Sequence, residues 1–287
     1  MSRNDATPTK MATAFVSVAL GFTWVYWLLM YLSRKRSLPF SMDGSIPGTI
    51  LAGILRDFGP AVAAVSVFAF YQGLGGLKQL WLTVARWRVS YWLYLLALLG
   101  PLGGACLVAL IGVLTGSMSR NPKPISAVHF IPLFFFMAVV DGPLGEEVGW
   151  RGLLLPQLLR RIGPVAASIV VGSIWWIWHV PLYLADGRIS KTSDWIEFLI
   201  DTLASSVIFT WFFLRSGSST LLTIVLHATA NFSIFLILRN IWHKDGNSMI
   251  PNYAHELIIV SVAVAAANSL RRFGSPVYVS LSKRRGL

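Results

Sequence analysis

The sequence predicts an all-α integral membrane protein, folded as a polytopic bundle of about eight transmembrane helices. Of its 287 residues, 55% are hydrophobic and only 13% are charged, whereas an average soluble domain is about 25% charged. The mean hydropathy is +0.64. Long apolar runs alternate with short polar segments, and about 20 apolar residues are what a helix needs to cross a bilayer.

The expected spans follow one another along the whole chain. They cover residues 12–32, 48–73, 90–115, 127–160, 164–184, 195–214, 219–239 and 253–270. The fourth is longer than a bilayer requires, so we expect it to bend or break around Gly142 and Pro143. Between the second and third spans, residues 75–89 carry apolar side chains on one side and basic ones elsewhere. This pattern predicts an amphipathic segment on the membrane surface.

We expect residues 1–287 to form one membrane domain, because no internal repeat or linker is evident. The first apolar run is long enough to span, so no cleaved signal segment is expected. An even number of spans puts both termini on the same side of the membrane. The basic residues of the loops and the tail are slightly more numerous on that side, which favours cytoplasmic termini.

The net charge of +12 also has a membrane explanation. The basic residues gather between apolar runs and at the end of the chain, in 34–36, 86–88, 160–161, 271–272 and 283–285. This placement is typical of anchors that contact lipid headgroups, so we expect membrane lipids and not nucleic acid as partners. Arg56 and Asp57, near the start of the second span, are expected at interface depth. Cys106 is the sole cysteine, which excludes a disulfide or a cysteine-based zinc site within the chain.

The most unusual stretch of the fourth span runs from Asp141 to Arg151 and reads D-G-P-L-G-E-E-V-G-W-R. A charged residue near the centre of a bilayer costs roughly 2.5–3.5 kcal/mol on insertion scales. Charged residues inside a span are therefore a functional-site hypothesis by default. The alternative is a charge cluster at interface depth that ends a helix.

Helix geometry divides the charges of this stretch. Glu146 and Glu147 are adjacent, so their side chains point about 100° apart on a helix. Arg151 follows Glu147 by four residues, the favourable order for an ion pair on one face. We therefore expect Glu147 and Arg151 to pair, which leaves Glu146 to point into a cavity as a candidate general base.

Two histidines in later spans are candidate partners of Glu146. His179 follows Trp175 and Trp178 near the end of the fifth span, where it is either functional or part of an interfacial aromatic belt. The two tryptophans are packing residues or line a substrate groove. His227 and Asn231 lie four residues apart in the seventh span and so share a face. They either hydrogen-bond between helices or stabilise an oxyanion.

Taken together, Glu146-Glu147-x-x-x-Arg151, Trp175-x-x-x-His179 and His227-x-x-x-Asn231 resemble the three motifs of the CPBP family of intramembrane proteases. That family includes the type II CAAX prenyl endopeptidases and bacteriocin-processing and immunity proteins. The resemblance covers a four-helix core, about residues 125–240, and departs from the family pattern at Trp175, where phenylalanine is usual. The resemblance implies an endopeptidase that acts near the membrane surface on a peptide or a lipidated protein.

The resemblance also implies roles for these residues. Glu146 would activate a water with the help of His179, His227 and Asn231 would hold the oxyanion, and Glu147 and Arg151 would support the site. The chain lacks the H-E-x-x-H signature of zinc proteases, so a mechanism without a cofactor is favoured. The alternative is a zinc ion ligated by Glu146, His179 and His227.

Two other functions remain open from the sequence. One is a non-catalytic immunity or scaffold protein with the same fold, which loss of a motif residue would favour. The other is a proton-coupled transporter, because buried Glu, His and Asn also build proton relays. A transporter is expected to show an inverted repeat, and none is evident.

Overall fold

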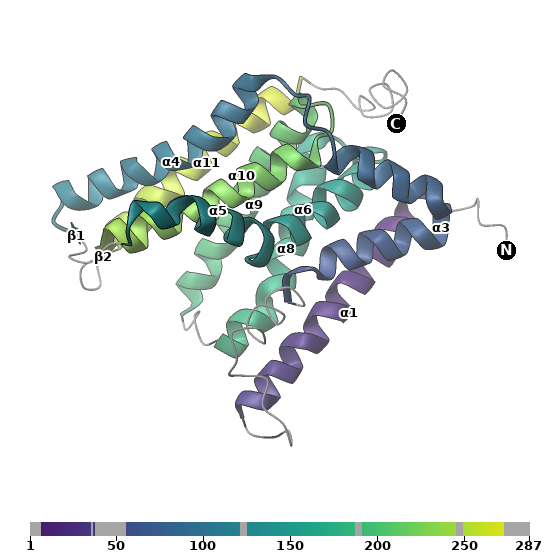
Figure 1. Ribbon diagram of the computed structural model, residues 1–287, viewed down its shortest axis with the longest axis horizontal. Coiled ribbons are helices and arrows are strands. Elements are labelled where there is room, and N and C mark those ends of the chain that lie inside the picture. Colours follow the sequence, from purple (N-terminus) through teal and green to yellow (C-terminus); the bar gives the residue numbers. More distant parts are fainter. Residues whose placement is uncertain are drawn as a thin grey trace.

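A computed structural model describes residues 7–35, 37, 56–120, 125–186, 191–244 and 249–272 of the chain. Within these ranges it is an all-α bundle with two strands of three residues each (Figure 1). The helices are α1 (Pro8–Arg34), α3 (Gly59–Val84), α4 (Tyr91–Leu114), α5 (Phe130–Val140), α6 (Pro143–Gly149), α7 (Leu155–Leu159), α8 (Pro164–Asp186), α9 (Thr192–Arg215), α10 (Thr220–Ser233) and α11 (Ile250–Leu270). The strands β1 (Met118–Arg120) and β2 (Trp242–Lys244) pair antiparallel.

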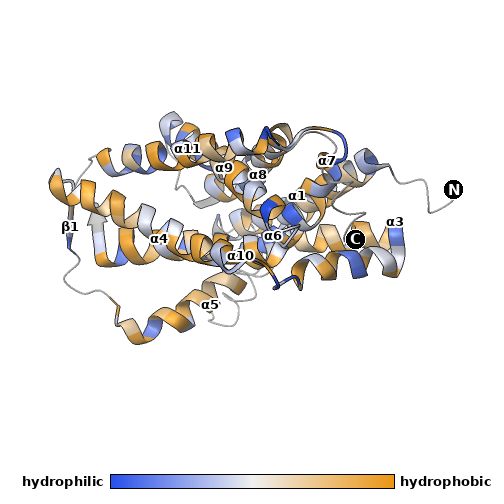
Figure 2. Cartoon of the chain, turned by 90° about the horizontal axis from the view of Figure 1, so that it is seen from above, coloured by the Kyte–Doolittle hydropathy of each residue, from blue (hydrophilic) through white to orange (hydrophobic). Residues whose placement is uncertain are grey.

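The predicted fold class is confirmed. In the part of the chain that the structure describes, eight helical segments are long and apolar enough to cross a membrane. They are Pro8–Ser33, Gly59–Val84, Tyr91–Leu114, Ala127–Leu159, Pro164–Leu184, Thr192–Arg215, Thr220–Ile241 and Ile250–Leu270. Hydrophobic residues cover much of α4 and α5 on their outer sides (Figure 2), as expected of helices that face lipid.

The second span differs from its expected bounds of 48–73. Residues 48–55 lie outside the described ranges, and α3 continues past 73 to Val84. Gly73 has φ 60° and ψ −146°, a backbone conformation open mainly to glycine, and there the helix divides into two limbs (Figure 1). The second limb coincides with most of the amphipathic segment expected at 75–89. Its Leu80 is buried, whereas Trp81 is 66% exposed.

The break predicted in the fourth span is present. Helix α5 ends at Val140, Gly142 takes φ 102°, and Pro143 begins α6. A proline at the first helical position lacks the N–H that would have no partner there, so it begins a new helix readily. After Gly149 the chain forms a π-helical segment, Trp150–Leu154, which leads into α7. A second π-helical segment, Ile234–Ile241, extends α10.

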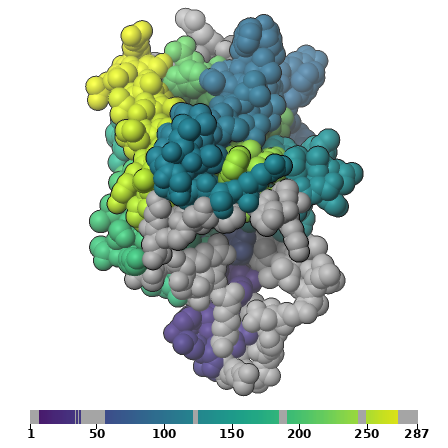
Figure 3. Space-filling view, turned by 90° about the vertical axis from the view of Figure 1, so that its left-hand side faces the viewer, coloured from purple at the N-terminus to yellow at the C-terminus, as the bar shows by residue number. Residues whose placement is uncertain are grey.

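The helices around α6 form the core. Helix α6 packs on α3, α5 and α10, while α8 lies between α1 and α9. Helix α11 packs on α9 and α4, and α4 packs on α10 (Figure 1). Figure 3 shows α5 on the outside of the bundle, where it lies against α10. The largest core cluster includes residues of α1, α3, the π-helical segment Trp150–Leu154 and α8. Trp27, Trp150 and Trp178 are among its members.

Candidate active site

Two glycines bring α6 close to the start of α3. A Cβ atom on Gly145 would lie 2.6 Å from the carbonyl oxygen of Asp57, and one on Gly149 would lie 2.6 Å from that of Pro60. Neither position has room for a side chain. Because α6 packs this closely, its two glutamates are removed from water: Glu146 is 5% exposed and Glu147 is fully buried.

Glu147 is shared by a cation and a histidine. Its Oε1 lies 2.8 Å from Nη1 of Arg151 and 3.0 Å from Nδ1 of His227. Glu147 and Arg151 are both 0% exposed, and the guanidinium lies 4.6 Å from the ring centroid of Phe209. The i,i+4 pairing expected from the sequence is therefore present. The contact between Glu147 and His227 joins α6 to α10, and sequence spacing did not reveal it.

Glu146 has a different partner. The indole Nε1–H of Trp175 on α8 donates to Oε2 of Glu146 at 2.5 Å. The same indole packs edge-on against the ring of His227, with 5.5 Å between centroids. Trp175 thus contacts both the acidic helix and the histidine of α10. Its contact with Glu146 makes it part of the site, beyond the packing or groove role expected from the sequence.

His179 lies one turn after Trp175 in an aromatic environment. Its Nδ1 lies 2.9 Å from the carbonyl oxygen of Trp175, and because a carbonyl only accepts, Nδ1 carries the proton. The ring packs against Trp178 and Phe198, with centroids 4.6 and 5.2 Å away. In the neutral ring Nε2 is therefore an acceptor. The structure gives no direct hydrogen bond from His179 to Glu146 among the described residues.

Trp178 requires a correction. Its side chain is 0% exposed and packs against Trp27 of α1 and Trp150. A side chain without exposed surface cannot line an open groove, so Trp178 is a core residue. Trp175 is also buried, at 7% exposed, and reaches the site through its contacts with Glu146 and His227.

Asn231 follows His227 by one turn of α10, on the same face. Its Nδ2 lies 3.5 Å from the backbone carbonyl oxygen of Asp141, at the end of α5. The break between α5 and α6 therefore lies opposite the His227–Asn231 face of α10. At this break, a Cβ atom on Gly142 would collide with Oε1 of Glu146.

The sequence did not place Arg56 and Asp57 at this site. Two guanidinium nitrogens of Arg56 bond the Asp57 carboxylate at 2.7 and 2.6 Å, and Arg56 also lies 3.5 Å from Asp141. Asp57 is 5% exposed, and burial raises its pKa while the hydrogen bond from Arg56 lowers it. Only the charge pair was visible in the sequence. Its position beside the glutamates depends on the close contact between α3 and α6.

The alternative zinc site does not fit these side chains as they stand. Among the described residues, no group of three His, Cys, Asp or Glu side chains could hold a metal ion. The three expected ligands also have separate partners: Glu146 accepts from Trp175, His179 bonds a carbonyl, and His227 bonds Glu147.

Comparison with known proteins agrees with the motifs. Residues 127–233 match the family model described as type II CAAX prenyl endopeptidase Rce1-like. The resemblance to the CPBP family is confirmed over these residues. The match contains all of the predicted site, from Glu146 to Asn231, and excludes α1, α3, α4 and α11.

A curated relative gives the same result. The chain is 31% identical over 113 residues to CAAX prenyl protease 2 of Methanococcus maripaludis. The alignment covers 37% of this chain and 41% of the relative, so the chain matches about two fifths of the relative's length.

Proposed function

We propose that the protein is a CAAX-type intramembrane endopeptidase that hydrolyses a peptide bond near the membrane surface. The observation that carries this proposal is the position of Trp175, whose indole donates to Glu146 and packs against His227. A buried carboxylate and a candidate oxyanion donor thus contact the same aromatic side chain. The matched segment, residues 127–233, contains all three side chains.

In the proposed mechanism Glu146 is the general base. It takes a proton from water, and the resulting hydroxide attacks the carbonyl carbon of the scissile peptide bond. His179 holds this water through Nε2, since its Nδ1 is bonded to the backbone. Glu146 then gives the proton to the leaving amine as the tetrahedral intermediate breaks down. This transfer needs no cofactor.

His227 and Asn231 would stabilise the oxyanion of that intermediate. The Glu147 carboxylate only accepts hydrogen bonds, so Nδ1 of His227 carries a proton. Donation to the oxyanion from Nε2 therefore requires the imidazolium form, and Glu147 balances its charge at 3.0 Å. Asn231 donates through its amide whatever the state of the histidine. Glu147 and Arg151 act by positioning His227.

The proposed substrate is supported by the family match and not by the site alone. We propose a prenylated protein or peptide, held in the bilayer by its lipid, as the family description and the relative's name indicate. A bacteriocin precursor or another membrane-anchored peptide suits the same site. We further propose that the chain forms one membrane domain with both termini in the cytoplasm.

Cleavage of a quenched fluorescent peptide tests the proposal. Wild-type protein in detergent is assayed on a peptide with a farnesylated cysteine near its carboxyl end and on the same peptide without the lipid. Glu146→Gln keeps the shape of the side chain but removes the base, so cleavage should fall by about 10²–10⁴-fold. Glu256→Gln on α11 changes a half-buried carboxyl outside the site and serves as the matched control.

The outcomes separate the candidate functions. Loss of cleavage in Glu146→Gln, with the control unchanged, supports the glutamate mechanism. Full activity in Glu146→Gln would remove this residue from catalysis. If folded wild-type protein cleaves neither peptide, the immunity or transporter functions are favoured instead.

A further inference from the structure

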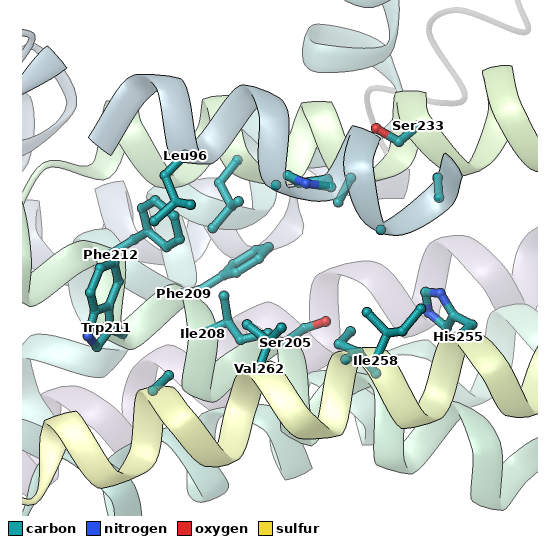
Figure 4. Close-up of a pocket in the computed structure, with 18 of the residues that line it drawn as sticks. Leu96, Ser205, Ile208, Phe209, Trp211, Phe212, Ser233, His255, Ile258 and Val262 are labelled. Atoms are coloured by element: carbon teal, nitrogen blue, oxygen red, sulfur yellow. The ribbon is translucent and has the colours of Figure 1, made fainter. Parts of the chain in front are cut away.

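A large cavity lies behind α10, among α4, α9, α10 and α11 (Figure 4). Its volume is about 470 Å³, within the range of roughly 300–1,000 Å³ typical of small-molecule sites. The lining is almost wholly apolar and includes Leu96, Phe212 and Ile258. Leu226 and Ala230 of α10 also line it, each one residue before a residue of the candidate site. Helix α10 therefore borders both the cavity and the candidate site.

The cavity is accessible from the lipid-facing surface. Leu96 of α4 and Val262 of α11 both line it and are 48% and 49% exposed. Both helices are long and apolar enough to cross the membrane, so their exposed side chains face hydrocarbon. An apolar cavity open to hydrocarbon accepts a hydrocarbon chain without removing any polar group from water.

The length of the cavity suits one lipid chain. Lining residues run along α11 from His255 to Ser269, roughly 21 Å at 1.5 Å per residue. One leaflet is about half of the 30 Å hydrocarbon thickness, or roughly 15 Å. A chain from a single leaflet therefore fits within the cavity. Figure 4 shows His255 and Trp211 at its opposite ends.

The two ends differ in charge. At the His255 end, Nε2 of His255 lies 3.2 Å from the Asp201 carboxylate, and Glu256 is adjacent in sequence. At the other end, Ser269 accepts hydrogen bonds from both Trp211 and Arg215. The exposed residues Arg271 and Arg272 follow α11 directly. This end coincides with the ends of two spans, at Arg215 and Leu270, where a lipid headgroup lies.

We propose that this cavity binds an anionic glycerophospholipid, with one acyl chain between α4, α9, α10 and α11 and its phosphate near Arg215, Ser269 and Arg271. The acidic end would repel a phosphate, so the lipid has one orientation. Polar and basic side chains at the membrane boundary supply the donors that a phosphate requires. The proposal does not depend on the proposed protease activity.

Phe209 connects the bound lipid to the candidate site. It lines the cavity, and its ring lies 5.5 Å from the ring of His227 and 4.6 Å from the guanidinium of Arg151. An acyl chain packed against Phe209 would hold these contacts in place. Bound lipid should therefore stabilise the protein against heat, because a ligand that binds only the folded state raises Tm.

Two pairs of variants test the site. Gly104→Leu fills the cavity, because a Cβ atom there meets only Ile258, at 3.9 Å. Gly103→Leu is its matched control, since its Cβ meets nothing within 4 Å and the residue does not line the cavity. Arg215→Gln with Arg271→Gln removes charge at the headgroup end. Arg160→Gln with Arg161→Gln is the control, because these are two exposed arginines outside the cavity lining.

The readout is retention of added lipid by native mass spectrometry, with Tm measured in parallel. The probes are phosphatidylglycerol and, as the neutral reference, phosphatidylcholine. We expect wild type to retain phosphatidylglycerol preferentially. Gly104→Leu should lose retention, and each arginine removed should weaken it about fivefold, which is roughly 1 kcal/mol. Both controls should match wild type in retention and in the rise of Tm with lipid.

Three results would overturn the proposal. The first is equal retention of the two lipids, which would show hydrocarbon contact without headgroup recognition. The second is unchanged retention in folded Gly104→Leu, which would place the lipid elsewhere on the surface. The third is equal loss in the Arg160→Gln, Arg161→Gln control and in the headgroup variant, which would show that only overall charge matters.

Discussion

Replacement of Arg151 by methionine tests the buried charge network most directly. Methionine keeps much of the volume of the arginine stem but removes the charge and the hydrogen bond to Glu147. Both residues of the pair are 0% exposed, so water does not replace the lost partner. Removal of one member of a buried ion pair typically costs about 3–5 kcal/mol.

The structure places the expected loss at the lower end of that range. After the substitution, Oε1 of Glu147 still has Nδ1 of His227 at 3.0 Å. In addition, Nε and Nη2 of Arg151 have no hydrogen-bond partner among the described residues, so the wild-type arginine is itself incompletely satisfied. We therefore expect a loss of about 3 kcal/mol. For a domain of this size such a loss corresponds to a fall in Tm of roughly 6–12 °C.

A double-mutant cycle separates charge from packing. Tm and detergent-induced unfolding are measured for Arg151→Met, Glu147→Gln and the double variant. If the cost is that of an uncompensated Glu147 charge, the double variant should be more stable than Arg151→Met by about 1–2 kcal/mol. Equal Tm values for Arg151→Met and wild type would refute the pairing. Strict additivity would show that the two side chains do not interact.

Two further predictions concern the break before α6 and the absence of a metal step. Gly142→Ala should reduce cleavage strongly, because the residue takes φ 102° and a Cβ atom there would collide with Oε1 of Glu146. Gly116→Ala, also at a positive φ (66°) but with open space around it, avoids the collision and is the control. A metal chelator should leave cleavage unchanged, since the three candidate ligands have separate partners. Activity that is lost to the chelator and restored by zinc would contradict this prediction and assign Glu146, His179 and His227 as ligands.

The parts of the site within one helix could be predicted from the sequence. Helix periodicity alone places Arg151 one turn after Glu147 and Asn231 one turn after His227. The break at Gly142 followed from the length of the fourth span and from the proline beside it. These features depend on residues that are close together in the sequence, so they could be predicted without knowing how the helices pack.

Contacts between helices could not be predicted in the same way. The i,i+4 spacing predicted an ion pair between Glu147 and Arg151. The structure shows that the Glu147 carboxylate also bonds His227, 80 residues further along the chain. Asp57 reaches the site only because Gly145 lets α3 approach α6. The second span was expected to end at residue 73. Gly73 does interrupt the helix with a positive φ, and a second limb then continues α3 to Val84.

Among the described residues Glu146 forms no direct ion pair, unlike the other acidic residues of its stretch. Glu147 pairs with Arg151, and Asp141 lies near Arg56. Among the described residues, by contrast, Glu146 accepts a hydrogen bond from the neutral indole of Trp175 and forms no ion pair. A buried carboxylate that is in no direct ion pair lowers stability. Glu146→Gln should therefore raise Tm while it abolishes cleavage, because the amide oxygen can still accept from Trp175. Glu147→Gln should instead lower Tm, because Arg151 loses its carboxylate. A higher Tm would indicate that the protein retains a destabilising carboxylate because catalysis requires it. A lower Tm for Glu146→Gln would mean instead that the charge of Glu146 stabilises the fold.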